Sequence, residues 1–194
     1  MTKIDNSRTL YRGRLFEIVQ QDVNIGTTIK TFEFARRGPG TRIIVVSDEK
    51  QMILTREFRR ELNSYDIRLP GGKVFDSLEE FEQARNSESS IETYAEKAAK
   101  RELEEETGYA AADLELLGIS KCGATIQWDL YYFLCTNWTA PVVAFKPMED
   151  EDISVNWYHF SDAENYCLNG TISEERSAIR ILRFLRGVKN GLPS

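Results

Sequence analysis

The segment Arg101-Glu102-Leu103-Glu104-Glu105-Glu106-Thr107-Gly108-Tyr109 constrains this chain more than any other part of the sequence. On a helix that advances about 100° per residue, Glu102, Glu105 and Glu106 share one face and Glu104 points away from it. Like charges three and four residues apart repel one another, and a hard divalent cation such as Mg²⁺ or Mn²⁺ is the natural compensation. The segment by itself therefore predicts either a metal-binding helix or a solvated acidic face.

The scarcity of two residue types excludes several kinds of catalytic site. His159 is the only histidine among 194 residues, which argues against Ser-His or Cys-His catalysis and against metal sites built on several imidazoles. The three cysteines are an odd number without CxxC spacing, so neither a disulfide framework nor a sulfur-rich zinc site is expected. Carboxylates are therefore the groups expected to carry any chemistry.

The charge of the chain is unevenly distributed. Residues 1–60 carry a net charge of +5 and residues 61–194 a net charge of −11. Acidic groups beside an arginine-rich region suit a divalent cation that bridges to a phosphorylated substrate, whereas a uniformly basic surface for nucleic acid is not expected. No apolar run approaches the roughly 20 residues of a membrane helix, and the polar start lacks a signal-peptide pattern. We therefore expect a cytoplasmic protein that binds neither nucleic acid nor membrane.

The hydrophobic pattern predicts strands and helices in mixed order. A helix is expected over about residues 92–107, with Gly108 as its C-terminal stop. The apolar runs 42–47 and 52–57 predict a hairpin in a buried sheet. Two earlier strands are expected to flank a turn near Gly26. The absence of a regular alternation of strand and helix favours a mixed sheet flanked by helices.

The acidic segment and a glycine-rich stretch before it resemble a known family. Residues 101–109 fit the core REUxEExGU of the Nudix box, and Leu69-Pro70-Gly71-Gly72 resembles the glycine entry to the same motif. The resemblance implies an α/β fold, the Nudix α/β/α sandwich with a mixed sheet and an N-terminal antiparallel strand layer. It also implies a Mg²⁺ or Mn²⁺ cofactor, Arg101 as the residue that orients the glutamates, and these candidate metal ligands: Glu102, Glu105, Glu106 and the carbonyl of Gly72.

The spacing inside the motif departs from the family pattern. The pattern Gx5Ex7REUxEExGU places its arginine 14 positions after its glycine, whereas Arg101 follows Gly72 by 29 positions, so 15 residues are inserted. Residues 76–91 are rich in Glu and Ser, and we expect them to form a solvated loop or a short surface helix. Loop closure tolerates such an insertion because its entropic cost grows only logarithmically with length. Surface decoration is the simplest role, and a substrate lid and a partner contact are the alternatives.

Segments outside the box resemble the ADP-ribose pyrophosphatase branch of the family. They are residues 11–16, 37–40, 54–59 and 149–153, together with the last helix. The resemblance implies an N-terminal layer over residues 1–40 that forms a homodimer, a Nudix domain over residues 41–194, and a nucleotide substrate between the two subunits. Guanidinium groups can hold phosphate oxygens in a bidentate manner, and solubilising strand ends is the alternative role. The candidate substrate contacts are Arg59, Glu33, Arg37 and Arg60.

The resemblance implies hydrolysis of the diphosphate of a nucleoside diphosphate sugar, with ADP-ribose yielding AMP and ribose 5-phosphate. The candidate catalytic residues are Glu106, Glu105, Glu151 and Arg101. Either Glu151, in the acidic run 149–152, or a box glutamate is the candidate general base, and an ordinary exposed turn is the alternative interpretation of that run.

One segment leaves the substrate open. Cys122-Gly123-Ala124 lacks the proline that many ADP-ribose hydrolases carry at this place. GDP-mannose, another sugar nucleotide or a nucleoside triphosphate is therefore an alternative substrate. A catalytically silent, nucleotide-binding regulatory protein is the alternative function.

Overall fold

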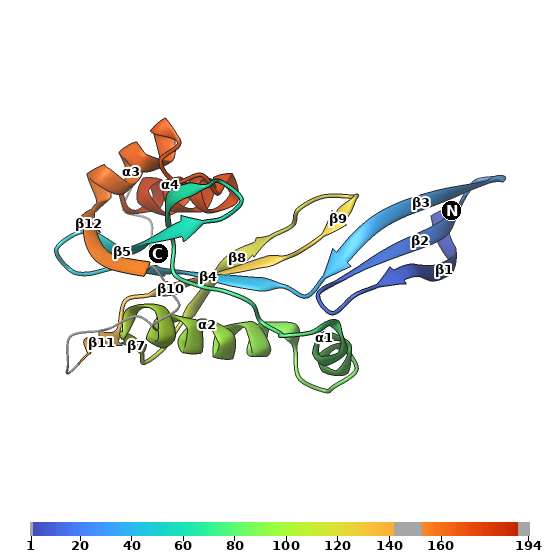
Figure 1. Ribbon diagram of the computed structural model, residues 1–194, viewed down its shortest axis with the longest axis horizontal. Helices are drawn as coiled ribbons and strands as arrows, with labels where there is room; N and C mark the ends of the chain where they lie inside the picture. Colours follow the sequence, from blue (N-terminus) through green and yellow to red (C-terminus); the bar gives the residue numbers. More distant parts are fainter. Residues whose placement is uncertain (1, 142–152, 190–194) are drawn as a thin grey trace.

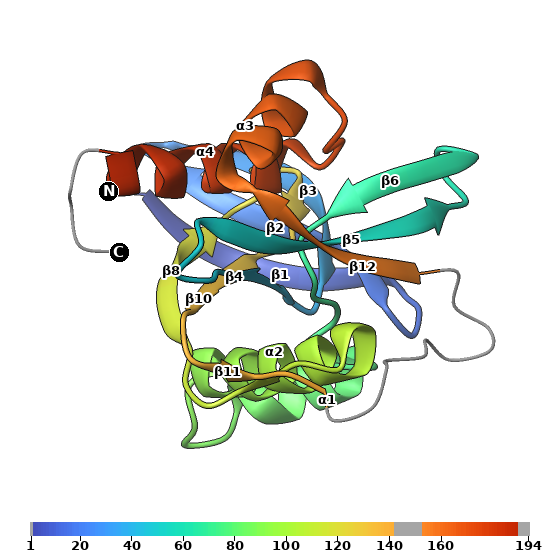
Figure 2. The ribbon, with the colours of Figure 1, turned by 90° about the vertical axis from the view of Figure 1, so that its left-hand side faces the viewer.

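The computed structural model describes residues 2–141 and 153–189 and arranges them in layers. Helix α2 (Ile91–Thr107) covers one side of the central strands, and helices α3 (Phe160–Asn169) and α4 (Glu175–Lys189) cover the other side (Figure 2). This arrangement is the α/β/α sandwich expected from the sequence. Among the described helices, none combines the length and the apolar character that crossing a membrane requires.

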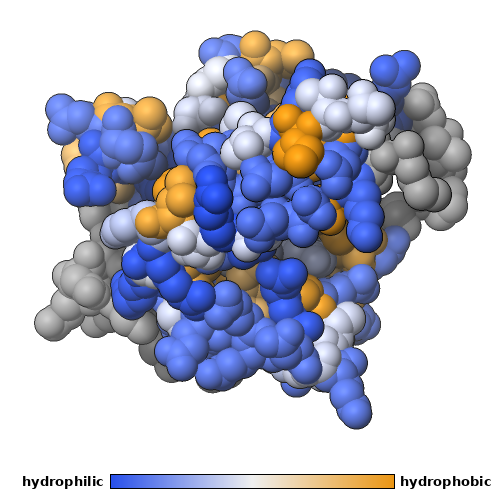
Figure 3. Space-filling view, turned by 90° about the vertical axis from the view of Figure 1, so that its right-hand side faces the viewer, coloured by the Kyte–Doolittle hydropathy of each residue, from blue (hydrophilic) through white to orange (hydrophobic). Residues whose placement is uncertain are grey.

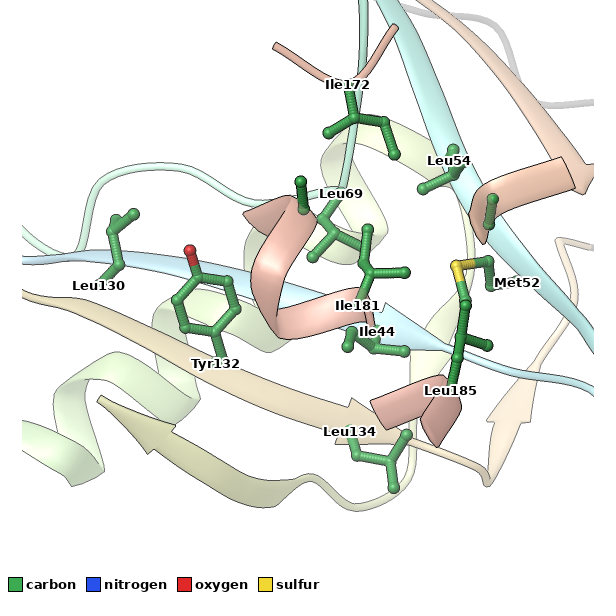
Figure 4. Packing of buried hydrophobic residues seen from close by; sticks show 12 residues of the cluster. Ile44, Met52, Leu54, Leu69, Leu130, Tyr132, Leu134, Ile172, Ile181 and Leu185 are labelled. Carbon is green, nitrogen blue, oxygen red and sulfur yellow. The ribbon is translucent and has the colours of Figure 1, made fainter. Parts of the chain in front are cut away.

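The central sheet is mixed, and two of its three strands are buried on both faces. Strand β10 (Leu130–Cys135) pairs in parallel with β4 (Gly40–Val45) and antiparallel with β8 (Glu115–Ser120). Successive side chains of β10 alternate between the two sides: Tyr131 and Phe133 pack in the cluster with α2, while Tyr132 and Leu134 pack in the cluster beneath α4 (Figure 4). Helices on both faces explain why these strands are almost continuously apolar.

A second, antiparallel sheet has the order β12–β5–β6, with β5 (Gln51–Arg59) between β12 (Ile153–His159) and β6 (Ser64–Arg68). Two short strands, β7 (Ala110–Ala111) and β11 (Trp138–Thr139), pair with each other.

The prediction that the runs 42–47 and 52–57 form a hairpin is wrong. Both runs form strands, β4 and β5, but a single bridge from Val46 to Met52 joins them. The physical reason is that both edges of β4 are already occupied. One edge carries β10, and at the other the amides of Thr41 and Ile43 donate to the loop carbonyls of Gly72 and Pro70, each at 2.9 Å.

The N-terminal strands extend away from the layered body (Figure 1). Strands β1 (Thr2–Arg12), β2 (Phe16–Ile25) and β3 (Thr28–Arg37) form an antiparallel sheet, and β9 (Ile126–Gln127) pairs in parallel with β3. The expected turn lies at Gly26, whose φ of 64° belongs to the left-handed region. Strand β1 was not expected from the sequence. The domain boundary at residue 40 stays a prediction.

Helix α2 confirms the helix expected over residues 92–107. The side chain of Ser90 caps its first turn, and Gly108 ends it with a φ of 75°. Its buried residues include Ala95, Ala99 and Leu103, which pack in the cluster against the central sheet. The inserted segment contains a short helix, α1 (Leu78–Arg85), one of the two forms expected for it.

A substitution at Gly71 can test how closely the loop Leu69–Gly72 is held against β4. The φ of Gly71 is +138°, and a Cβ at this position would overlap the carbonyl oxygen of Thr41. We expect Gly71→Ala to lower the free energy of unfolding by at least about 1 kcal/mol, measured by urea denaturation. Gly187→Ala in α4 is the matched control, because a Cβ there meets open space. Equal unfolding midpoints for the two variants would show that the loop can move away from β4 without a loss of stability.

Candidate active site

The last turns of α2 form one wall of a cleft of about 290 Å³, called here the α2 cleft. The opposite walls come from the loop before the insertion, from β4 and from β5. Residues from segments far apart in the sequence therefore meet at one place. The lining residues are Arg37, Gly40, Arg42, Thr55, Glu57, Arg59, Arg68, Leu69, Gly71, Gly72, Lys73, Glu102, Glu106 and Trp128.

Glu106 is the most deeply placed carboxylate of the cleft. The backbone amide of Gly71 donates a hydrogen bond of 2.8 Å to its Oε2 atom. Burial raises the pKa of Glu106 to about 8; the Gly71 amide opposes this rise, and the negative charge of Glu102 adds to it. The glycine-rich loop therefore holds Glu106 in place while the cleft disfavours its ionised form.

Glu102 and Arg101 form the rim of this wall. The guanidinium of Arg101 binds Glu102 Oε1 at 2.7 Å through Nη2 and Glu105 Oε2 at 2.8 Å through Nη1. Burial raises the pKa of Glu102, although the charge of Arg101 opposes this effect. The Glu102 carboxylate lies directly against Gly72, where any side chain would collide with it. Arg101 thus has the orienting contacts that the sequence led us to expect.

This donor set fits a divalent cation. Two half-buried carboxylates next to each other resist ionisation, and a hard cation with oxygen ligands removes that penalty. The carbonyl of Gly72 accepts the amide of Thr41 and keeps a second lone pair. Within residues 2–141 and 153–189, no three carboxylate, imidazole or thiolate side chains already converge as a metal site. One or two carboxylates, completed by substrate phosphates and water, are the usual Mg²⁺ arrangement.

The structure brings together some of the residues predicted for the site and separates others. The predicted residues that line the α2 cleft are Glu102, Glu106, Gly72, Arg37 and Arg59. Those that do not line it are Glu105, Arg101, Arg60 and Glu33, all of which are exposed. Glu151 lies outside the described residues. The ligand and catalytic roles of all these residues stay predictions.

Two arginines of the cleft were missed by the sequence analysis. Arg42 lies in the buried strand β4, and its Nε binds Glu174 Oε2 at 2.9 Å. Arg68 binds Asp66 at 2.6 Å between Nε and Oδ2. An arginine inside the apolar run 42–47 was the available signal, because a cation in a buried strand needs an anionic partner.

The cations of the cleft differ in whether a carboxylate neutralises them. Arg42, Arg59, Arg68 and Lys73 each take part in an ion pair. Arg37 has no such partner among the described residues, and its Cζ lies 4.7 Å from the ring centroid of Trp128. Burial lowers the pKa of Arg37, and the neighbouring charge of Arg42 lowers it further.

Comparisons with known proteins add the following findings. The sequence pattern of the NUDIX domain matches residues 36–177. A methanol dehydrogenase activator from Bacillus methanolicus is 28% identical over 117 residues, which are 59% of this chain and 55% of that protein. An ADP-ribose pyrophosphatase from Bacillus subtilis (strain 168) is 30% identical over 107 residues, 54% of this chain and 49% of that protein. The chain thus spans about half the length of these curated relatives.

A solved structure described as an ADP compounds hydrolase has the same fold. It superimposes with a TM-score of 0.69 over 96% of this chain and 95% of that chain. The sequence identity is 21%, so this likeness bears on the fold alone.

The buried pair of Arg42 and Glu174 gives a test of how the cleft is held. Their side chains are 9% and 12% exposed, and Arg42→Met leaves the Glu174 carboxylate without its partner. We expect the free energy of unfolding to fall by about 3 kcal/mol in urea titrations. Lys100→Met is the control, because it breaks the exposed Lys100–Glu96 pair, which contributes far less. A similar decrease in the free energy of unfolding in both variants would contradict the importance of the buried pair.

Proposed function

The chain belongs to the Nudix family, and on that premise we propose that it hydrolyses the diphosphate of nucleoside diphosphate sugars with the help of Mg²⁺ or Mn²⁺. ADP-ribose is the proposed substrate, and AMP and ribose 5-phosphate are the products. The observation that carries the proposal is one cleft in which two carboxylates of α2 face several guanidinium groups. The likeness to the Bacillus subtilis ADP-ribose pyrophosphatase supports the choice of ADP-ribose.

Substrate binding is the first task of the cleft. Its guanidinium groups suit the diphosphate because a planar, charged donor can hold two phosphate oxygens at once. Arg59 is held by Glu57 and Glu61, each at 2.9 Å, and so is positioned before a substrate arrives. Arg37 lies against the rings of Phe16 and Trp128 and offers its charge directly to the phosphate.

The carboxylates carry the chemical step. Glu102 and Glu106, with the Gly72 carbonyl, would hold the divalent cation. When bound, this cation neutralises the diphosphate and lowers the pKa of a bound water molecule. Arg101 keeps the Glu102 carboxylate directed into the cleft, and the Gly71 amide does the same for Glu106. A box glutamate or Glu151 accepts the proton as the water attacks one phosphorus of the diphosphate, and the bridging P–O bond breaks so that AMP and ribose 5-phosphate separate.

Assembly is a separate proposal. We infer that two copies of this chain associate through the strands β1–β3. These strands expose apolar side chains, among them Ile4 at 56%, Ile29 at 61% and Phe32 at 48%. Figure 3 shows the end of the molecule at which these strands lie, with hydrophobic side chains scattered among hydrophilic ones. A second copy that covers the face carrying Ile4 and Phe32 would remove these side chains from water.

The role of Glu106 can be tested by a change that keeps its shape. We expect Glu106→Gln to lower the turnover of ADP-ribose by orders of magnitude while circular dichroism shows an intact fold, because the amide cannot serve as an anionic ligand. Glu104→Gln is the matched control on the same helix, since Glu104 is exposed and outside the cleft. A loss below about tenfold, roughly 1.4 kcal/mol of barrier, would remove Glu106 from the mechanism.

The oligomeric state can be measured by light scattering at micromolar concentration. We expect a dimer for the native chain and a shift towards monomer for Phe32→Glu, because a charge there would be desolvated in the interface. Leu168→Glu on α3 is the control, since Leu168 is 70% exposed and lies outside β1–β3. A monomeric native chain would contradict the proposed assembly.

A further inference from the structure

A second cavity of about 370 Å³ lies beside the α2 cleft, and we call it the α1 pocket. Its walls come from the end of β3, from α1, from the start of α2 and from the segment 121–127. Arg37 lines both the α1 pocket and the α2 cleft, so the two cavities are neighbours across one side chain. A ligand that reached past Arg37 from the cleft would enter the pocket.

The lining of the α1 pocket carries an excess of positive charge. Arg36 is neutralised by Glu17, with 2.6 Å between Nε and Oε1. The other three cations, Arg37, Arg85 and Lys121, have no carboxylate within ion-pair distance in the described part of the chain. Asp129 is the one acidic residue among those that line the pocket. The pocket is therefore short of negative charge, which a ligand can supply.

The inserted residues build one wall of this pocket and are firmly attached. Arg12 binds Glu82 of α1 through two hydrogen bonds of 2.9 and 2.8 Å, and the amide of Leu78 donates to the Arg14 carbonyl at 2.9 Å. Phe81 of α1 packs on Phe75, with 5.5 Å between the ring centroids. The helix that presents Phe81 and Arg85 to the pocket is thus fixed to the N-terminal sheet, as Figure 1 shows from its position beside those strands.

We propose that the α1 pocket binds a phosphate group that the substrate carries in addition to its scissile diphosphate. This proposal rests on the proposed function, which places the diphosphate in the α2 cleft. Both ends of ADP-ribose are uncharged, so ADP-ribose leaves Arg85 and Lys121 without a counter-charge. A substrate with a further phosphate on one of its riboses provides three acceptor oxygens for them. The preferred substrate class is therefore a nucleoside diphosphate sugar that bears an extra phosphate.

The first test compares two substrates that differ by one phosphate, ADP-ribose and ADP-ribose 2′-phosphate. We expect Arg85→Gln and Lys121→Gln each to lower kcat/KM for the phosphorylated substrate by about tenfold, because each removes a charge-assisted hydrogen bond. The kcat/KM for ADP-ribose stays unchanged. Lys97→Gln is the control, since Lys97 is exposed on α2 and does not line the pocket. Equal effects on both substrates, or none on either, would overturn the proposal.

The second test needs no turnover. Cys122 is exposed and lines the α1 pocket, whereas burial raises the pKa of Cys135 and of Cys167 to about 11. Iodoacetamide reacts with thiolates and should therefore modify Cys122 first. We expect ADP-ribose 2′-phosphate to slow this alkylation several-fold in the native chain and not in Arg85→Gln.

The two tests separate the pocket from the reaction. Protection of Cys122 without hydrolysis of either substrate would support the pocket and reject the hydrolase. Hydrolysis without protection would keep the hydrolase and overturn the pocket.

Discussion

The loop Leu69–Gly72 lies against the edge of β4, and the geometry of the site depends on this contact. Two loop carbonyls accept the amides of Thr41 and Ile43, so the loop takes the place of a further strand. The next amide of the same loop, from Gly71, binds Glu106 on α2. Sheet, loop and helix are therefore joined within a few residues. A glycine is required at position 71 because only a residue without Cβ can approach β4 so closely.

Features that depend on local sequence could be predicted, and features that depend on distant partners could not. The extent of α2 follows from its apolar spacing and its glycine stop, and both are properties of neighbouring residues. The pairing of β4 depends on which distant segments lie along its two edges, and apolar runs carry no such information. The same limit explains Arg42, because its partner Glu174 lies 132 residues away along the chain.

The glutamates of α2 show that prediction from sequence is limited even within one turn of a helix. The sequence places Glu102, Glu105 and Glu106 on the same side, but only Glu102 and Glu106 line the cleft. Arg101 is four residues before Glu105 and binds it on the outer surface, while Glu102 and Glu106 lie against the glycine loop. A helical wheel of α2 cannot show this difference, because it does not contain the glycine loop.

The pairing of cations divides the basic residues into two groups with different physical consequences. Arginines held by carboxylates, such as Arg42 and Arg59, lose little conformational freedom when a ligand binds. Their main contribution is therefore to fix the position of the ligand, because their charge is already neutralised by the carboxylates. Unpaired cations, such as Arg37 and Arg85, contribute attraction because no carboxylate of the described residues forms an ion pair with them. The paired cations lie mostly at the α2 cleft, with Arg36 in the α1 pocket, and the unpaired group extends from the cleft into the α1 pocket. A phosphate chain that entered from the pocket would therefore meet the unpaired cations before the arginines that carboxylates hold in place.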